Sequence, residues 1–213
     1  MQNTKQQFIE FALEADVLRF GEFKTKAGRL SPYFFNAGLF NTGARLDRLG
    51  AFYAETLLAA RKAGRLDFDM IFGPAYKGIP LAASVAMNLS RMGRDVPWAF
   101  NRKEIKDHGE GGMIVGAPLK GRVVIIDDVI SAGTSVRESV KIIEANNASP
   151  SGVLIAVDRM ERGGTADAPT ATSAVQDVEK TFGLSVVSII NLHDLLAFMD
   201  GPSEKAKTVA QYR

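Results

Sequence analysis

The sequence contains no cysteine, which excludes disulfide bonds and thiolate zinc sites. Its two histidines, His108 and His193, are too few for a histidine-based metal site without help from carboxylates. The 26 Lys and Arg residues nearly balance 24 acidic residues, and a net charge of +2 gives no reason to expect a nucleic-acid partner. No apolar run is long enough to span a bilayer, and residues 1–10 are too polar for a secretion signal. We therefore expect a cytoplasmic protein without nucleic-acid or membrane partners.

The composition is that of an ordinary globular domain. Of the 213 residues, 46% are apolar and 23% are charged, which is enough to bury a core within one large domain. Apolar periodicity predicts helices over residues 6–13, 46–60, 78–92, from 136 onward and 192–199, and strands over 69–72, 96–100, 123–126, 152–157 and 184–190. Strands that alternate with helices predict an α/β fold with a mostly parallel central sheet flanked by helices.

Three segments fall outside this alternation. Residues 21–24 and 31–36 look extended around a turn at 26–29, so about residues 1–40 are expected to form a small N-terminal hood. Residues 101–117 are rich in glycine without a periodic apolar pattern, and we expect a mobile loop there. Residues 161–174 have a similar character and are expected to form a surface loop.

Residues Val123 to Ser135, V-V-I-I-D-D-V-I-S-A-G-T-S, are the most informative segment. Four β-branched residues predict a strand buried on both faces, and helical spacing begins at Val136. Ligands of open α/β sheets bind at the carboxyl ends of strands, where Asp127 and Asp128 stand. Loop amides and a helix N-terminus suit a phosphate, while the acids suit sugar hydroxyls or a metal-bound ligand. Acids followed by Ser, Gly and Thr also occur in ordinary turns and N-caps, but the length of the whole string favours a binding site.

A second turn, Gly73-Pro74-Ala75-Tyr76-Lys77-Gly78, also joins a predicted strand to a predicted helix. Its glycines permit close approach of the backbone to a ligand, and Lys77 adds a positive charge that suits pyrophosphate. Taken alone, the segment is equally consistent with an ordinary turn that carries a surface lysine. Its place beside the first motif favours pyrophosphate binding.

The stretch from Asn101 to Gly112, N-R-K-E-I-K-D-H-G-E-G-G, gathers Arg102, Lys103, Lys106 and His108. A run of charges is most often a solvated surface. Here the run lies between two predicted strands whose ends converge on the phosphate site. Cationic side chains on a closing loop stabilise the charge that develops on a departing pyrophosphate, so the pattern favours a catalytic loop.

Three further features are ambiguous by themselves. Lys26 is a turn cation that alone looks like any surface lysine. Phe34 and Phe35 are more typical of a core than of a ligand platform, although a planar substrate needs apolar walls. Arg159 follows a predicted strand and suits a substrate carboxylate, or an ion pair with Asp158 or Glu161.

Taken together, these residues resemble a known family. The string from Val123 to Ser135 resembles the phosphoribosyl pyrophosphate (PRPP) motif of type I phosphoribosyltransferases, and it lacks the Gly-Lys-Ser/Thr of a Walker loop. Over nearly its whole length the chain resembles the orotate-specific branch of that family, because S-P-Y-F-F-N-A-G from Ser31 occurs together with the stretch from Asn101. Adenine and hypoxanthine phosphoribosyltransferases share the PRPP motif without these stretches. The resemblance implies the type I phosphoribosyltransferase fold and transfer of ribose 5-phosphate from PRPP to orotate. The products would be pyrophosphate and orotidine 5′-monophosphate, on the route to UMP.

The resemblance also implies roles for individual residues. The PRPP site would comprise Lys26, Tyr76, Lys77, Arg102, Lys103, Lys106, His108, Asp127, Asp128, Val129, Ile130, Ser131, Ala132, Gly133, Thr134 and Ser135. The orotate site would comprise Lys26, Phe34, Phe35, Ser131 and Arg159. Catalysis would depend on Lys103, Lys106, His108 and Asp128, with His108 or a lysine as the candidate proton donor.

A Mg²⁺ cofactor and a homodimer with shared active sites are implied as well. The ion would be held mainly by PRPP and water, so no protein ligand set is expected. The catalytic loop, about residues 102–115, would reach the partner's site, with Arg102, Lys106 and His108 acting there. The chain departs from the family pattern at Ser131, where Thr is usual, and over residues 163–174, which look longer than usual.

Two other functions compete with this one. A phosphoribosyltransferase for another base would react with a purine or uracil and not with orotate. A PRPP-sensing regulator would keep Asp127 and Asp128 but would lack the loop cations and carry a nucleic-acid-binding element. The intact loop cations and the balanced charge favour the enzyme.

Overall fold

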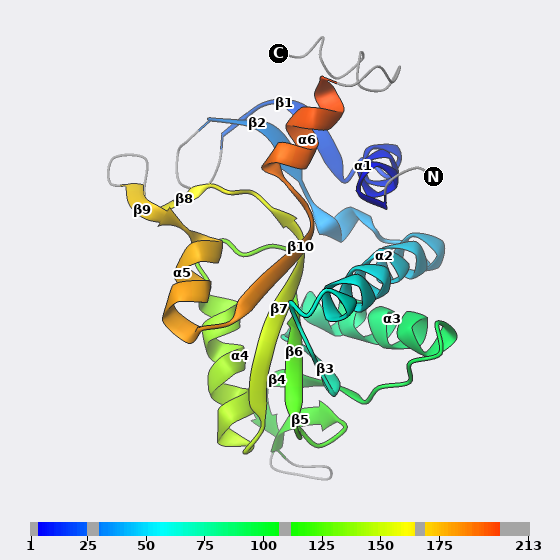
Figure 1. Ribbon diagram of the computed structural model, residues 1–213, viewed down its shortest axis with the longest axis vertical. Helices are drawn as coiled ribbons and strands as arrows, with labels where there is room; N and C mark the ends of the chain where they lie inside the picture. The colour runs from blue at the N-terminus through cyan, green and yellow to red at the C-terminus, as the bar shows by residue number, and fades with distance from the viewer. Residues whose placement is uncertain (1–3, 25–29, 107–111, 165–168, 201–213) are drawn as a thin grey trace.

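The computed structural model describes residues 4–24, 30–106, 112–164 and 169–200. Its centre is a six-stranded sheet in the order β10-β7-β6-β3-β4-β5 (Figure 1), in which every neighbouring pair is parallel except β4 and β5. The strands are β3 (Met70–Gly73), β4 (Trp98–Lys106), β5 (Gly112–Gly116), β6 (Arg122–Ile126), β7 (Ser149–Asp158) and β10 (Ser185–Asn191). This confirms the predicted α/β fold with a mostly parallel sheet.

Helices cover both faces of this sheet. One face packs against α1 (Thr4–Glu14), α2 (Gly43–Lys62), α3 (Gly78–Arg91) and α6 (Leu192–Met199), and the other against α4 (Thr134–Ala145) and α5 (Ala174–Phe182). The sequence of β6 is continuously apolar because both faces of this strand are buried. Val124 and Ile126 join the first core, while Val123 and Ile125 join the second. Among the described residues, no helix has the length and apolar character needed to cross a membrane.

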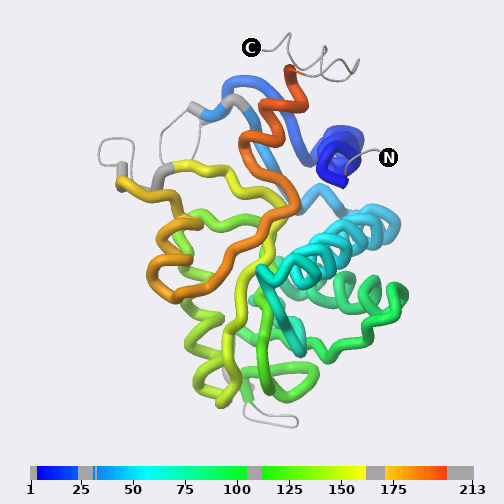
Figure 2. The backbone as a smooth tube through the Cα atoms, viewed as in Figure 1, coloured from blue at the N-terminus to red at the C-terminus, as the bar shows by residue number. Residues whose placement is uncertain are grey.

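The predicted hood hairpin is present. Strands β1 (Leu18–Lys24) and β2 (Leu30–Phe35) form a separate antiparallel pair, with Leu18 opposite Phe35. A short 3-10 helix, η1 (Ala37–Leu39), follows. Figure 2 shows the blue hairpin beside the red helix α6 at one end of the molecule. There Lys5 of α1 pairs with Asp194 of α6 at 2.9 Å, so the two ends of the described chain meet beside the hood.

Two predicted loops are wrong for most of their length. Within 101–117, β4 continues to Lys106 and pairs with β5, with Phe100 opposite Val115 and Asn101 opposite Ile114. Backbone pairing at the edge of a sheet needs no alternating apolar pattern, so this sequence gave no strand signal. Within 161–174, β8 (Arg162–Gly164) pairs with β9 (Pro169–Ser173), and helix α5 begins directly afterwards. Residues 107–111 and 165–168, which come between these strands in the sequence, lie outside the described residues.

Candidate active site

The Asp127–Ser135 segment lies at the carboxyl end of β6, as predicted. Its backbone stays paired with β7, because the Asp127 N–H donates to Leu154 O at 3.1 Å and the Ala156 N–H donates to Asp128 O at 2.9 Å. From helix α2, Tyr53 Oη donates to Asp127 O at 2.8 Å. The two consecutive acids are therefore anchored by main-chain contacts, which leaves their carboxylates to line a cavity.

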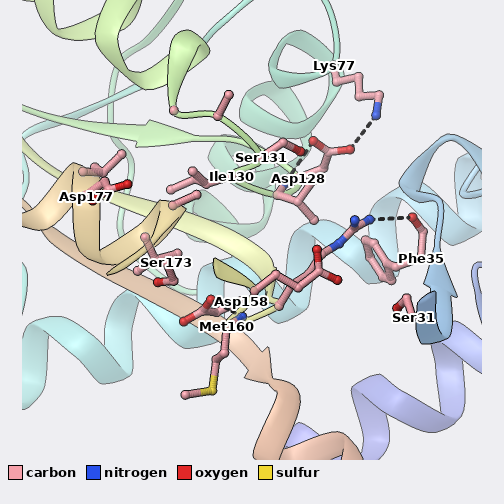
Figure 3. Close-up of a pocket in the computed structure, with 18 of the residues that line it drawn as sticks. Ser31, Phe35, Lys77, Asp128, Ile130, Ser131, Asp158, Met160, Ser173 and Asp177 are labelled. Atoms are coloured by element: carbon pink, nitrogen blue, oxygen red, sulfur yellow. Dashed lines mark hydrogen bonds and ion pairs between the residues drawn. The ribbon is translucent and has the colours of Figure 1, made fainter. Parts of the chain in front are cut away.

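The two carboxylates differ in their surroundings. Asp127 Oδ1 accepts the Asp128 N–H at 2.9 Å, and burial followed by the charge of Asp128 raises the pKa of Asp127 to about 6. Asp128 Oδ1 accepts the Val129 N–H at 2.9 Å, and its Oδ2 accepts from Lys77 Nζ at 2.7 Å (Figure 3). Both residues are less than a tenth exposed. The acids therefore present a partly neutralised pair of acceptors suited to ribose hydroxyls.

The loop after the acids forms a phosphate-sized recess at the start of α4. Gly133 has a left-handed φ of 70° and precedes the helix without a side-chain cap, so the first-turn N–H groups of α4 are not met by a capping side chain. A cavity of about 440 Å³ lies here, and its wall consists of Pro74–Lys77 and Asp127–Val136. Both predicted phosphate-binding turns thus meet around one space, where backbone amides and a helix N-terminus favour an anion.

A second cavity of about 730 Å³ adjoins the first and extends under the hood. Phe34 and Phe35 of β2, Asp128 and Ser131 of the loop, and Arg159 after β7 all line it. Arg159 Nη2 lies 3.5 Å from Phe35 O, the contact marked at Phe35 in Figure 3. The cavity therefore combines an aromatic wall with a guanidinium, which suits a planar anion.

Two buried polar atoms at this cavity lack partners. Tyr33 Oη and Arg159 Nε make no hydrogen bond in the described structure. Nor does Arg159 form an ion pair with Asp158 or Glu161 within the described part of the chain. Because a buried donor such as Arg159 Nε normally has a hydrogen-bond partner, this arrangement favours a ligand for Arg159 over the structural ion pair considered above.

Known proteins resemble this chain over its full length. Residues 45–186 match the family model of the phosphoribosyl transferase domain. An orotate phosphoribosyltransferase of Herminiimonas arsenicoxydans is 61% identical over 213 residues, which cover 100% of this chain and 94% of the relative. The chain belongs to the orotate phosphoribosyltransferase family.

Solved structures agree with this assignment. The crystal structure of the orotate phosphoribosyltransferase of Francisella tularensis has a TM-score of 0.80 and 40% identity, and the match covers 97% of both chains. The Mycobacterium tuberculosis enzyme in complex with PRPP has a TM-score of 0.62 at 18% identity over 91% of this chain and 99% of that one, which shows the shared fold alone.

Within this orotate phosphoribosyltransferase fold, most of the predicted site residues come together. The smaller cavity is lined by Tyr76, Lys77, Asp127, Asp128, Val129, Ile130, Ser131, Ala132, Gly133, Thr134 and Ser135. The larger one is lined by Phe34, Phe35, Lys77, Asp128, Val129, Ile130, Ser131, Ala132, Gly133 and Arg159. Lys77, Asp128 and the loop that follows belong to both walls, so the two spaces share one junction.

The predicted loop cations lie apart from these walls. Arg102 and Lys103 are on β4, where Arg102 Nη1 donates to Gly112 O at 3.1 Å and Lys103 Nζ pairs with Glu138 of α4 at 3.2 Å. Neither is among the described residues that line these two cavities. Lys106 ends strand β4, while Lys26 and His108 lie outside the described residues.

Several residues at the site were missed in the sequence. Asn101 Oδ1 accepts the Ala75 N–H at 3.0 Å and so connects β4 to the turn between Gly73 and Gly78. The wall opposite the hood is α5, with Val175, Val178 and Phe182 lining the larger cavity. Their helical spacing, behind a Ser173 that forms a capping box with Gln176, is a readable signal for this helix.

Proposed function

We propose that this chain performs the reaction of its family in the joined cavities, transferring ribose 5-phosphate from PRPP to orotate. The observation that carries the proposal is the shared junction of the two spaces. The recess with the two acids opens into an aromatic pocket where Arg159 forms no ion pair with the described residues. A phosphorylated sugar and a planar anionic base therefore fit end to end.

In this proposal each wall has a distinct task. The loop Ser131–Ser135 and the N-terminus of α4 bind the 5′-phosphate, and Asp127 and Asp128 accept hydrogen bonds from the ribose hydroxyls. Tyr76 and Lys77 bind the pyrophosphate. Phe34, Phe35, Ser131 and Arg159 hold orotate. Lys26, which lies outside the described residues, is proposed to contribute as well.

The chemistry is then largely electrostatic. Breaking the bond between the anomeric carbon and pyrophosphate leaves positive charge on the ribose, which the buried acids stabilise. Lys77 is placed to exchange its contact with Asp128 for the departing pyrophosphate. Lys103, Lys106 and His108 supply further positive charge, and His108 or a lysine delivers a proton to the leaving group.

Asp127 and Asp128 are also the acidic side chains nearest to where a Mg²⁺ ion would bind with PRPP in this proposal. The described residues contain no group of three or more His, Asp or Glu side chains able to bind a metal. Asp127 and Asp128 offer oxygen donors next to the recess, which fits an ion held mainly by PRPP oxygens and water. When bound, the ion supplies charge neutralisation at the pyrophosphate.

A homodimer with shared sites belongs to the same proposal. Arg102 and Lys103 lie on the β4–β5 hairpin, at the edge of the sheet opposite β10, and outside both cavity walls of their own chain. A partner's loop would bring Arg102, Lys106 and His108 to the site. The cytoplasm is the proposed location, in keeping with phosphorylated substrates.

Orotate absorbance tests the reaction directly. We expect the ultraviolet signal of orotate to fall only when protein, PRPP and Mg²⁺ are all present, and to recover on adding orotidine 5′-monophosphate with pyrophosphate. The variant Asp128→Asn is the matched control and should lose most of this turnover. An unchanged signal, while PRPP still binds by calorimetry and uracil or a purine is consumed, would assign another base.

A further inference from the structure

The backbone turns sharply directly after strand β7. Met160 has a φ of 51°, in the left-handed region that non-glycine residues seldom adopt. The Met160 N–H donates to Asp158 Oδ1 at 2.9 Å, so the Asp158 carboxylate closes a turn around Arg159 (Figure 3). A left-handed residue costs roughly 1 kcal/mol, and this hydrogen bond offsets such a cost.

Little else sets the direction of the Arg159 side chain. Its Nη2 contact with Phe35 O is long at 3.5 Å, and its buried Nε has no partner in the described structure. No carboxylate within the described residues forms an ion pair with it. The path of the backbone through Asp158, Arg159 and Met160 is therefore the main constraint that aims the guanidinium into the cavity.

Asp158 itself is poorly suited to touch an anionic base. It lines the same cavity, but its carboxylate would repel orotate, and one of its oxygens is already engaged by the turn. Burial raises the pKa of Asp158, the Met160 N–H lowers it, and the charge of Glu179 raises it further. The turn is thus a stabilising contact for this carboxylate.

We infer that Asp158 is a positioning residue that orients Arg159 toward orotate through the turn it closes on Met160. The inference rests on the proposed orotate contact of Arg159. It predicts a specific pattern, since the turn needs only an acceptor oxygen at position 158, and that acceptor affects only the orotate half of the reaction.

Four variants of the full-length chain distinguish a positioning role of Asp158 from a merely structural one. Asp158→Ala removes the acceptor, Asp158→Asn retains an Oδ1 acceptor without the charge, Arg159→Ala removes the guanidinium, and Asp158→Ala/Arg159→Ala combines two changes. The readouts are KM for orotate, KM for PRPP, kcat and the thermal midpoint.

We expect Asp158→Ala to raise KM for orotate on the order of fivefold or more, and Arg159→Ala on the order of tenfold or more, with KM for PRPP little changed. Asp158→Asn should stay within about twofold of the parent chain, because its amide oxygen still accepts the Met160 N–H. The double variant should match Arg159→Ala, because a residue that acts through another adds nothing once the other is gone.

Four results would overturn the inference. One is an unchanged KM for orotate in Asp158→Ala, another is an equal defect in Asp158→Asn, and the third is full additivity in the double variant. A drop in thermal midpoint with both KM values raised alike would indicate a merely structural role and would overturn it too. An unchanged KM for orotate in Arg159→Ala would instead refute the proposed orotate contact.

Discussion

The hydroxyl of Tyr53 on helix α2 donates a hydrogen bond of 2.8 Å to the backbone carbonyl of Asp127, at the start of the acid pair. Tyr53 is fully buried, so helix α2 reaches through the core to the site. Its burial, reinforced by the nearby charges of Asp128 and Asp127, raises the pKa of Tyr53 and keeps the hydroxyl protonated as a donor.

Replacing Tyr53 by Phe tests this link. The change leaves the Asp127 carbonyl without its side-chain donor, so we expect a loss of about 1–3 kcal/mol in the free energy of unfolding and a higher KM for PRPP. Tyr33→Phe is the matched control, because the buried Tyr33 hydroxyl has no partner in the described structure and its removal should cost little stability. Urea denaturation of both variants makes the comparison, and equal losses would contradict the assigned hydrogen bond.

Helices α2 and α3 pack closely at Gly50, where no Cβ separates them. A Cβ on Gly50 would stand 2.1 Å from Ser84 Oγ and 2.9 Å from the Ser84 carbonyl carbon, and Ser84 Oγ is itself committed to Leu46 O at 2.8 Å. We therefore expect Gly50→Ala to lower the free energy of unfolding by about 2 kcal/mol or more.

The control for that change lies in the same helix. A Cβ on Gly43 would have no described atom within 4 Å, so Gly43→Ala should be neutral or stabilising by up to about 1 kcal/mol. Denaturant midpoints at constant m-value distinguish the two variants. Similar midpoints for both variants would show that α2 and α3 move apart at Gly50 at little cost and accommodate the added Cβ.

The raised pKa of Asp127, about 6, predicts a pH dependence of stability without ligands. Because the folded state favours the protonated acid, its contribution is fully present below the unfolded pKa of about 4 and is lost as the pH rises through about 6. The loss should be on the order of 3 kcal/mol. Asp127→Asn does not titrate, so its stability relative to the parent should improve between those pH values and then stay level. Urea denaturation across this range measures the difference, and parallel profiles would argue against a raised pKa.

Sharing of the site across a dimer can be tested by complementation. Lys106→Ala should reduce kcat on the order of a hundredfold or more, and Asp128→Asn should inactivate the acid pair. If the loop acts in the partner's site, co-expression of the two variants should restore about a quarter of the parent activity, because half of the dimers are mixed and each has one intact site. No recovery in a sample shown to contain mixed dimers would place the loop in its own chain's site.

Much of the fold could be predicted from contiguous stretches of sequence. The strand, acids, loop and helix of Val123 to Ser135 occupy thirteen consecutive positions, so periodicity and small residues define them locally. Asn191 is of a residue type that suits an N-cap, and it forms a capping box with Asp194 at the start of α6. Such features depend on neighbours within one turn of chain.

The errors arose where distant segments decide the structure. The β4–β5 pairing extends over residues whose charges looked like a loop, because an edge strand is stabilised by backbone hydrogen bonds and not by an apolar face. Helix α5 was not predicted because it begins at the end of the glycine- and threonine-rich residues 161–174, although its Val175 and Val178 are buried against the sheet.

By itself, the sequence determined which residue types are available for chemistry: a consecutive acid pair, two turns that suit phosphates, a cationic run and Arg159 directly after β7. The tertiary structure alone decided which of them meet. Lys77 reaches Asp128 across 51 positions and Arg159 reaches Phe35 across 124. The physical reason is that parallel strands bring their carboxyl ends to one edge of the sheet, while helix and hood packing then selects which side chains face the shared space.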